Sequence, residues 1–244
     1  MNPEVDWRHA GAPPSFAPRV GVDRDALVAN IRAALVDSPH GIVDARGAGW
    51  GHGPSFVARG ALDAGADGVL IEPGVRPGSV GLTEATVRWS PEGLLDPLRV
   101  YGLPDTDGML RGRPVMSLSG RVLLVKAVQA GEGVSYGYTY RAARATRVAL
   151  VTGGYAQGVV RSIGNLVSVR IGEYECPIVG RVAMDVSMVE IDDAPVSAGD
   201  EVRFFGDPAT GAPSLGAWVR ASGLTAGEIV TTVARHAVSR EAFR

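Results

Sequence analysis

The chain contains one lysine, Lys126, against 23 arginines in a sequence of 244 residues. A guanidinium cannot form a Schiff base with a carbonyl compound, so chemistry of that kind has only Lys126 available to it. Lys126 lies in the strand-like run of residues 121–129, and we predict that it is a solvent-facing structural residue. The scarcity of lysine therefore bears directly on which reactions the chain can perform.

Cysteine and long apolar runs are also scarce. A single cysteine, Cys176, excludes an intramolecular disulfide, and we expect it to be a small buried residue of a strand. No run of about 18 apolar residues occurs, which argues against a membrane span. The first residues lack a basic segment followed by an apolar one, so we expect a cytoplasmic protein. A net charge of −2 gives no reason to expect nucleic acid or membrane as a partner.

The pattern of prolines and of apolar residues divides the chain into three parts. Residues 1–18 carry four prolines and predict an irregular arm. Residues 19–108 alternate strand-like and helix-like segments, which predicts a shortened, barrel-like β/α domain. Its expected strands and helices are residues 19–23, 26–36, 41–45, 54–64 and 68–72, with further possible strands at 86–89 and 97–101.

Residues 109–244 have a different pattern, with short strands separated by turns. We expect a mainly antiparallel β barrel or sandwich domain here. The expected strands are residues 120–128, 146–152, 166–171, 176–182, 187–191 and 201–205. A helix is expected at residues 225–235, where Thr225 and Glu228 match a capping box.

Four motifs follow one another in this second domain. They are Arg113-Pro-Val-Met-Ser-Leu, Ala130-Gly-Glu-Gly-Val-Ser-Tyr-Gly, Gly154-Tyr-Ala and Pro177-Ile-Val-Gly-Arg-Val-Ala-Met-Asp185. In this order they resemble the C-terminal β domain of alanine racemases over residues 113–235. In the first domain, residues 19–27 and the turn Gly49-Trp-Gly-His-Gly53 are similar to the opening strand, first helix and glycine-histidine turn of the same family.

The resemblance implies a (β/α)₈ barrel followed by a β domain, and pyridoxal phosphate held on a lysine near the end of an early barrel strand. It also implies a homodimer in which the β domain of one subunit contributes to the site of the other. Tyr136 corresponds to the family's catalytic tyrosine, and Tyr155 to a tyrosine near the substrate entrance. Met184 and Asp185 correspond to the family's Met-Asp pair.

The family chemistry explains why a tyrosine is needed. Moving a proton from one face of a carbon to the other requires an acid and a base on opposite sides, while pyridoxal phosphate acts as the electron sink. A free phenol titrates near about pH 10, so Tyr136 needs a cationic neighbour to act near neutral pH.

Several positions depart from the family pattern. Arg46 stands where the resemblance places the Schiff-base lysine, and Trp50 where it places a phosphate-binding tyrosine. Leu95 replaces an arginine that faces the pyridine nitrogen, and residues 96–97 replace part of the phosphate loop, although Arg76-Pro-Gly78 offers a rival register. Near the C-terminus, Phe243 is the nearest aromatic residue to a further expected tyrosine.

The first domain is also short for a barrel. About ninety residues separate Arg19 from Gly108, whereas a closed (β/α)₈ barrel takes roughly 200 to 250 residues. The middle units of the barrel are therefore expected to be missing. A shortened sheet leaves open edges, which adds to the expectation that the chain forms a homodimer.

Three hypotheses follow. The first, which we favour, is a cofactor-independent acid–base enzyme of isomerase, cyclase or lyase type, with Tyr136 acting on a small anionic substrate bound by Arg46 or His52. The second is a non-catalytic binding or regulatory protein that pairs with a full-length racemase or with itself. The third is a pyridoxal-phosphate-dependent racemase, which the missing lysine disfavours. Structural roles remain open for Tyr136 in a loop, His52 in a turn and Arg46 as a charge partner.

Overall fold

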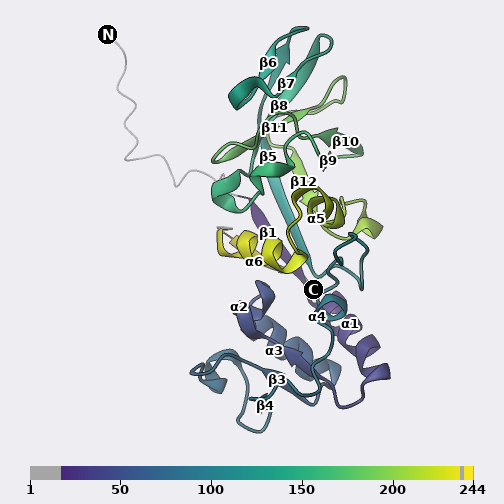
Figure 1. Ribbon diagram of the computed structural model, residues 1–244, viewed down its shortest axis with the longest axis vertical. Helices are drawn as coiled ribbons and strands as arrows, with labels where there is room; N and C mark the ends of the chain where they lie inside the picture. Colours follow the sequence, from purple (N-terminus) through teal and green to yellow (C-terminus); the bar gives the residue numbers. More distant parts are fainter. Residues whose placement is uncertain (1–17, 237–238, 244) are drawn as a thin grey trace, which may run out of the picture.

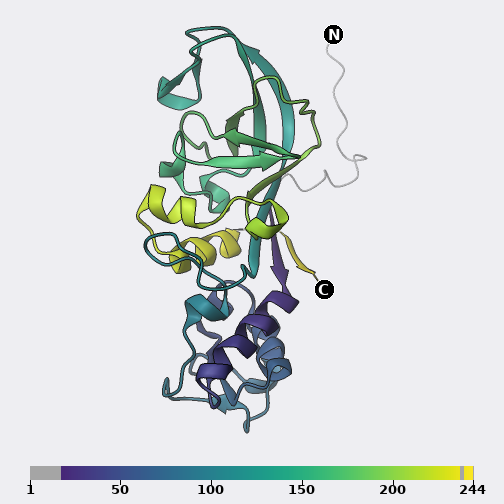
Figure 2. The same cartoon turned by 90° about the vertical axis from the view of Figure 1, so that its right-hand side faces the viewer.

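The computed structural model describes residues 18–236 and 239–243. Two lobes follow one another along the long axis of the molecule (Figure 1). The smaller lobe holds the helices and short strands of the first half of the chain, and the larger lobe is built on a β-sheet (Figure 2). No helix within the described ranges is both long and apolar enough to cross a membrane.

The smaller lobe is a parallel three-stranded sheet with helices packed on it. Its strands are β2 (Ile42–Asp44), β3 (Gly68–Leu70) and β4 (Val87–Arg88), paired in that order, and a parallel bridge from Ile42 to Leu94 extends the sheet. Helices α1 (Arg24–Asp37) and α3 (Pro54–Ala64) pack against each other, and α3 contacts β2 and β3. The predicted bounds of α3 are confirmed, because Pro54 starts it and Gly65 ends it in a left-handed conformation.

Strand β1 (Arg19–Asp23) forms where expected but joins the sheet of the larger lobe. It pairs antiparallel with β5 (Met116–Val128) and parallel with β13 (Ser239–Phe243). We expected it to open the shortened barrel, because a strand followed by α1 looks like a βα unit. The partner of a strand depends on contacts distant in sequence, and burial of Val20 and Val22 in the common core stabilises this pairing.

A second difference concerns residues 97–101, which we considered as a strand. They form the short helix α4 (Pro97–Val100). The Asp96 carboxylate accepts a hydrogen bond from the Leu98 amide at 2.9 Å, and Pro97 takes the first helical position. Asp96 and Pro97 thus form a helix N-terminus. The apolar residues that follow them favoured a strand instead, so this local signal was missed.

The larger lobe is mainly antiparallel, as expected from its short strands. The main path of its eight-stranded sheet is β10-β9-β12-β5-β1-β13, and β8 and β11 extend it beside β5. The remaining strands are β6 (Gly133–Val134), β7 (Tyr140–Arg141), β8 (Thr146–Thr152), β9 (Ser168–Ile171), β10 (Tyr174–Pro177), β11 (Val186–Glu190) and β12 (Glu201–Phe205). The predicted bounds of β8 and β12 are confirmed.

Lys126 and Cys176 take the structural roles predicted for them. Lys126 lies on β5, is mostly exposed, and forms an ion pair with Glu132 at 2.9 Å. Cys176 is buried in β10, and burial, with a contribution from the Glu175 charge, raises the pKa of its thiol. A thiol with a raised pKa is a weaker nucleophile at neutral pH, which agrees with a structural role for Cys176.

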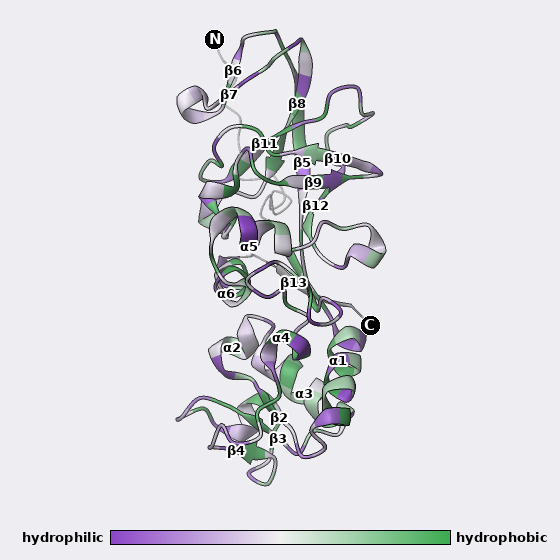
Figure 3. Cartoon of the chain, turned by 45° about the vertical axis from the view of Figure 1, so that its right-hand side comes forward, coloured by the Kyte–Doolittle hydropathy of each residue, from purple (hydrophilic) through white to green (hydrophobic). Residues whose placement is uncertain are grey.

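Helices α5 (Gly216–Ser222) and α6 (Ala226–His236) lie where the two lobes meet (Figures 1 and 3). The predicted capping box of α6 is confirmed, since Thr225 and Glu228 exchange hydrogen bonds. Close approach fixes α6 on both sides. A Cβ on Gly51 would meet the Val230 carbonyl at 2.8 Å, and one on Gly158 would meet the Val233 backbone at 2.7 Å.

Candidate functional site

The carboxyl end of β2 carries a charge pair. The Arg46 guanidinium donates two hydrogen bonds to the Asp44 carboxylate, from Nε at 2.8 Å and from Nη2 at 2.7 Å. The Asp44 side chain is 6% exposed and that of Arg46 is 45% exposed. Arg46 is therefore a charge partner at the sheet end, which is the structural role that the sequence left open for it.

The ion pair with Arg46 lowers the pKa of the Asp44 carboxyl. Burial alone raises the pKa of this carboxyl, but the hydrogen bonds and charge of Arg46, with a contribution from the Trp50 side chain, outweigh burial and hold the pKa below its usual range. Because the folded-state pKa is depressed, the stabilisation is present above the unfolded-state pKa and is lost as pH falls through the folded-state pKa.

An Asp44→Asn variant is therefore expected to be less stable near neutral pH, by roughly 1–3 kcal/mol, because it loses charge-assisted hydrogen bonds. Its stability should also fall less than that of the unchanged chain when pH is lowered through the acid range. Urea unfolding midpoints at a series of pH values measure both effects. Equal acid dependence in the two proteins would show that the pair contributes no pH-linked stability.

A left-handed turn follows Arg46. Residues 47–51 all have positive φ, between 51° and 78°, and two of them, Ala48 and Trp50, are not glycine. Such backbone is uncommon for residues with a Cβ, and it persists only where neighbours enforce it. The Glu72 carboxylate contributes by accepting a hydrogen bond from the Gly47 amide at 2.6 Å.

The turn places Trp50 and His52 against Tyr101. The ring of Tyr101 stacks on Trp50 at 5.8 Å and on His52 at 4.6 Å between centroids. Its hydroxyl donates to the Asp44 carbonyl, and burial, with a contribution from the Asp44 charge, raises the pKa of Tyr101 well above its usual range. His52 is buried within this stack, with Nδ1 2.8 Å from the Trp50 carbonyl. The stacked rings therefore pack beneath the turn and stabilise it.

Three other predicted residues, Tyr136, Tyr155 and Met184, are exposed on the larger lobe, as is Tyr138, and we call these four residues the aromatic face. Tyr136 is 71% exposed and Met184 is 54% exposed. Tyr155 and Met184 are adjacent, since the Ala156 amide donates to the Met184 carbonyl at 2.8 Å. Asp185 accepts a hydrogen bond from the Gln157 amide group at 2.7 Å, which ties the two loops of this face together.

Backbone strain is concentrated directly before Tyr136. Ser135 has φ 63° and ψ 179°, a region that only glycine enters readily. Its hydroxyl donates to the Arg181 carbonyl at 2.6 Å, and Gly180 packs closely against its Cβ. The surrounding structure therefore holds Tyr136 in one exposed position rather than leaving it in a free loop.

Two arginines on this face were missed by the sequence reasoning. The Arg161 guanidinium lies 6.0 Å from the centre of the Tyr155 ring, and the Arg181 side chain lies beside Gly137. Arg181 is part of the same motif as Met184 and Asp185, so the signal was available. Exposed arginines usually contact only solvent, and the sequence does not show that these two lie close together in the folded chain.

The predicted site residues form two groups. Arg46 and His52 lie in the smaller lobe near α2 (Arg46–Trp50), while Tyr136 lies beside β6 and β7 at the far end of the larger lobe (Figures 1 and 3). A cavity of about 350 Å³ lies between α2 and α6, and a groove of about 470 Å³ lies beside Thr139. The two share no lining residue, and neither is lined by Arg46 or Tyr136. Among the described residues, the structure thus places Tyr136 and Arg46 in different lobes.

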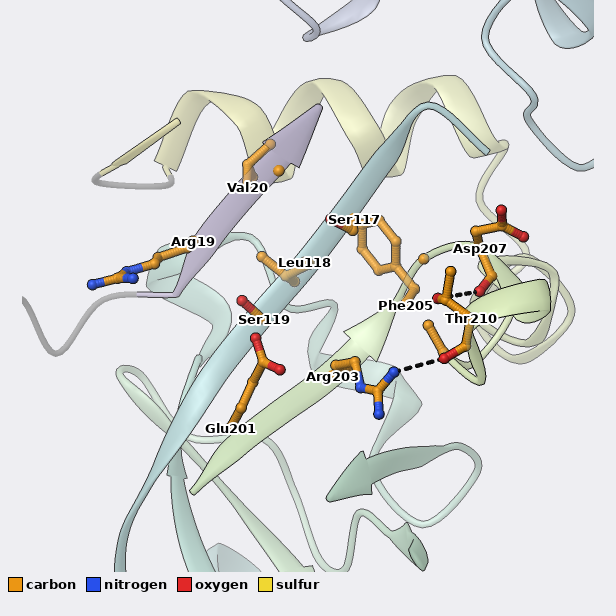
Figure 4. A pocket seen from close by; sticks show the side chains of 13 residues that line it. Arg19, Val20, Ser117, Leu118, Ser119, Glu201, Arg203, Phe205, Asp207 and Thr210 are labelled. Atoms are coloured by element: carbon orange, nitrogen blue, oxygen red, sulfur yellow. Dashed lines mark hydrogen bonds between the residues drawn. The ribbon is translucent and has the colours of Figure 1, made fainter. Parts of the chain in front are cut away.

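A third cavity, of about 240 Å³, lies on the sheet of β1, β5 and β12 (Figure 4). Two of its charged groups, Arg203 and Asp207, already have partners. Arg203 donates to the Thr210 carbonyl at 2.8 Å, and Asp207 forms an ion pair with Arg113 at 3.1 Å. Within residues 18–236 no cluster of three or more His, Cys, Asp or Glu side chains is arranged to hold a metal ion.

Residues 115–241 match the family model of the alanine racemase C-terminal domain. The chain belongs to the alanine racemase family. The alanine racemase of Salinispora tropica is 43% identical over 135 residues, which are 55% of this chain and 36% of that protein. That of Mycobacterium tuberculosis strain H37Rv is 42% identical over 139 residues, with the same shares covered. The match thus spans only 36% of the length of these relatives.

Solved alanine racemase structures resemble the whole described fold. The enzyme from Streptomyces lavendulae superposes with a TM-score of 0.79 at 21% identity, covering 95% of this chain and 98% of that one. The enzyme from Bartonella henselae with covalently bound pyridoxal phosphate gives 0.76 at 15% identity, covering 93% and 99%. The expected fold class, a shortened barrel-like domain followed by a mainly antiparallel β domain, is confirmed.

Proposed function

We propose that the chain acts as a β-domain subunit, which docks its aromatic face on the barrel of a complete alanine racemase family subunit and supplies Tyr136 to the site there. The observation that carries this proposal is the exposure of Tyr136 on a rigid strained turn, on the domain that is 43% identical to an alanine racemase. Exposed apolar and aromatic groups gathered on one face are typical of interaction surfaces.

The composition of the face supports docking. Tyrosine and arginine are enriched at the centres of protein interfaces, and methionine adapts its shape to a partner. Tyr138, Tyr155 and Met184 provide the large apolar surfaces, and Arg161 and Arg181 provide the charges beside them. Tyr136 is exposed on the same lobe, so docking through these groups would bury the tyrosine at the contact instead of leaving it in water.

The residues at the end of β2 do not fit pyridoxal phosphate, and we propose that the smaller lobe does not carry it. Arg46 has no amine to form a Schiff base, and its guanidinium is already bound by Asp44. The Glu72 carboxylate accepts a hydrogen bond from the Gly47 amide and places a second negative charge at this sheet end, which would repel a phosphate. Lys126 lies on β5, exposed and paired with Glu132.

In the docked subunit, Tyr136 has the chemistry of an acid–base group. Its phenol can donate a proton to a substrate carbon on the side that faces the β domain, or accept one from it. The hydrogen bond from Ser135 to Arg181 fixes the backbone directly before Tyr136, which lowers the entropic cost of positioning the tyrosine. The Arg181 side chain lies beside Gly137 of the same turn.

A second candidate is a cofactor-independent enzyme formed by two copies of this chain. It is favoured by the half-exposed Arg46 side chain, which a partner's β domain could meet with Tyr136. In that arrangement Arg46 would bind an anionic substrate and Tyr136 would exchange the proton. Homodimer formation with turnover in the absence of pyridoxal phosphate would distinguish this candidate from the first.

The first candidate predicts a functional rescue. The Salinispora tropica alanine racemase is made inactive by replacing its own tyrosine that matches Tyr136 with phenylalanine. Adding the unmodified chain is then expected to restore racemisation in proportion to the amount of hybrid formed, because each hybrid regains one tyrosine. If the hybrid forms and no activity returns, the proposed supply of Tyr136 is wrong.

A further inference from the structure

The cavity on β1, β5 and β12 is a hollow in the face of the sheet (Figure 4). Ser117 and Ser119 line it from β5 and, being two residues apart on a strand, point to the same face. A bulge in β12 between Arg203 and Phe205 interrupts the regular pairing with β5 at this point. Bulges occur often beside functional sites, because they redirect side chains. The volume of about 240 Å³ has room for one small organic molecule.

The charged side chains that line this cavity balance one another. Arg19 and Arg203 are positive, and Glu201 and Asp207 are negative. A ligand with a net charge of either sign would meet as many like charges as unlike ones, so the lining does not favour it. The lining favours a ligand that carries one charge of each sign.

The Glu201 carboxylate can accept the positive group of such a ligand. Within residues 18–236 it forms no ion pair and accepts no hydrogen bond, although two arginines stand beside it. Arg121, its cross-strand partner on β5, donates to the Gly199 carbonyl at 3.0 Å. Arg203, two residues along β12, donates to the Thr210 carbonyl at 2.8 Å. Both guanidinium groups are thus bound to backbone carbonyls, and the carboxylate is left to bind another cation.

Arg203 can bind the negative group. The backbone carbonyl that it contacts is neutral, so the bond holds the guanidinium in place and leaves its positive charge in the cavity. Strand geometry places its Cα about 6.8 Å from that of Glu201, on the same face of β12. Ser119 is the cross-strand partner of Arg203, and among the described residues the hydroxyls of Ser117 and Ser119 form no hydrogen bond. A carboxylate, a guanidinium and two hydroxyl groups therefore line one small space.

We propose that this cavity binds a small zwitterion, an α-amino acid with a polar side chain. Its ammonium group donates to the Glu201 carboxylate, and its carboxylate accepts from the Arg203 guanidinium. A hydroxyl of its side chain pairs with Ser117 or Ser119. Hydrogen bonds to charged groups are roughly twice as strong as neutral ones, so both ends of the ligand are held. These residues belong neither to the aromatic face nor to the end of β2, so the site is separate from those of the proposed function.

The test titrates the full chain, labelled with nitrogen-15, with L-serine and follows the amide signals by two-dimensional NMR. The signals of Ser119 and Arg203 are expected to shift in a saturable way, which also shows where the ligand binds. Ethanolamine lacks the carboxylate of L-serine, and 3-hydroxypropionate lacks its ammonium group. Each is expected to bind about tenfold more weakly than L-serine or worse, because each loses one set of charge-assisted hydrogen bonds.

Side-chain variants test the two charges. Glu201→Gln keeps the shape of the side chain and removes its charge, and it is expected to weaken binding of L-serine about tenfold. Glu84→Gln is the matched control, because Glu84 is exposed in the smaller lobe, and it should bind as the unchanged chain does. Arg203→Gln should also weaken binding about tenfold. Arg32→Gln should not, although it too removes an arginine that donates to a backbone carbonyl.

The Glu201 variant keeps the test decisive if Arg203→Gln does not fold, because the Glu201 carboxylate accepts no hydrogen bond within residues 18–236. Dispersed amide signals confirm that each variant is folded. Absence of saturable shifts at Ser119 and Arg203, equal binding of L-serine and either fragment, or equal binding by the Glu201 and Glu84 variants would overturn the proposal. The racemase rescue depends on Tyr136, so its outcome is independent of this one.

Discussion

Replacing Tyr136 by phenylalanine is expected to abolish the rescue of a tyrosine-deficient racemase, lowering the rate by about 10²- to 10⁴-fold relative to the unmodified chain. The phenylalanine ring keeps the shape and apolar surface of tyrosine and loses only the hydroxyl. Tyr136 is exposed and its hydroxyl is not needed by the fold, so the variant should remain folded and able to dock. The racemisation rate of the mixture measures the effect.

Tyr138→Phe is the matched control for this prediction. Tyr138 belongs to the same turn, is 63% exposed, and contacts Arg141 through its ring, 5.8 Å from the guanidinium carbon. Losing its hydroxyl is expected to leave the rescue rate within about twofold of that of the unmodified chain, because its ring contact is retained. If the two phenylalanine variants rescue equally well, Tyr136 is not the acid–base group.

Trp218→Ala is expected to cost about 3–5 kcal/mol of unfolding free energy, the largest effect on stability that we predict. Trp218 lies on α5 and is 1% exposed. Its ring makes edge-to-face contacts with Phe205 at 5.3 Å and with Phe204 at 6.3 Å, which fix α5 on β12. Alanine would leave a cavity beneath both rings. Guanidinium chloride unfolding followed by circular dichroism measures the loss.

Trp218→Phe separates packing from hydrogen bonding. The indole N–H of Trp218 has no hydrogen-bond acceptor in the part of the chain that the structure describes. Phenylalanine therefore loses volume but no hydrogen bond, and should cost clearly less than alanine. A cost for Trp218→Ala below about 1 kcal/mol would mean that the aromatic cluster does not fix α5 on the sheet.

Local signals predicted much of the fold. The bounds of α3 follow from Pro54 and Gly65, and the start of α6 follows from Thr225 and Glu228, because helix ends depend on residues close in sequence. The pairing of β1 could not be predicted in this way. Its partner β5 lies about ninety residues further along the chain, and a βα pattern does not specify which sheet a strand joins.

The same distinction between local and long-range signals applies to the candidate site. Tyr136, Tyr155 and Met184 could be named from motifs, since each motif keeps its residues together in sequence. The groove beside Thr139 could not be predicted, because Thr139, Arg161 and Arg181 come from three loops that meet only in the folded chain. The sequence allowed Arg46 to be a charge partner, and only the structure identifies Asp44 as the group that it binds.

Native mass spectrometry of the chain mixed with the Salinispora tropica alanine racemase tests the docking proposal most directly. We expect a hybrid of one copy of each protein. Met184→Glu should remove the hybrid, because it places a buried charge in the apolar centre of the contact, while Val36→Glu, at an exposed position on α1, should not. The appearance of each protein only by itself, or a hybrid equally abundant with Met184→Glu, would contradict docking through the aromatic face.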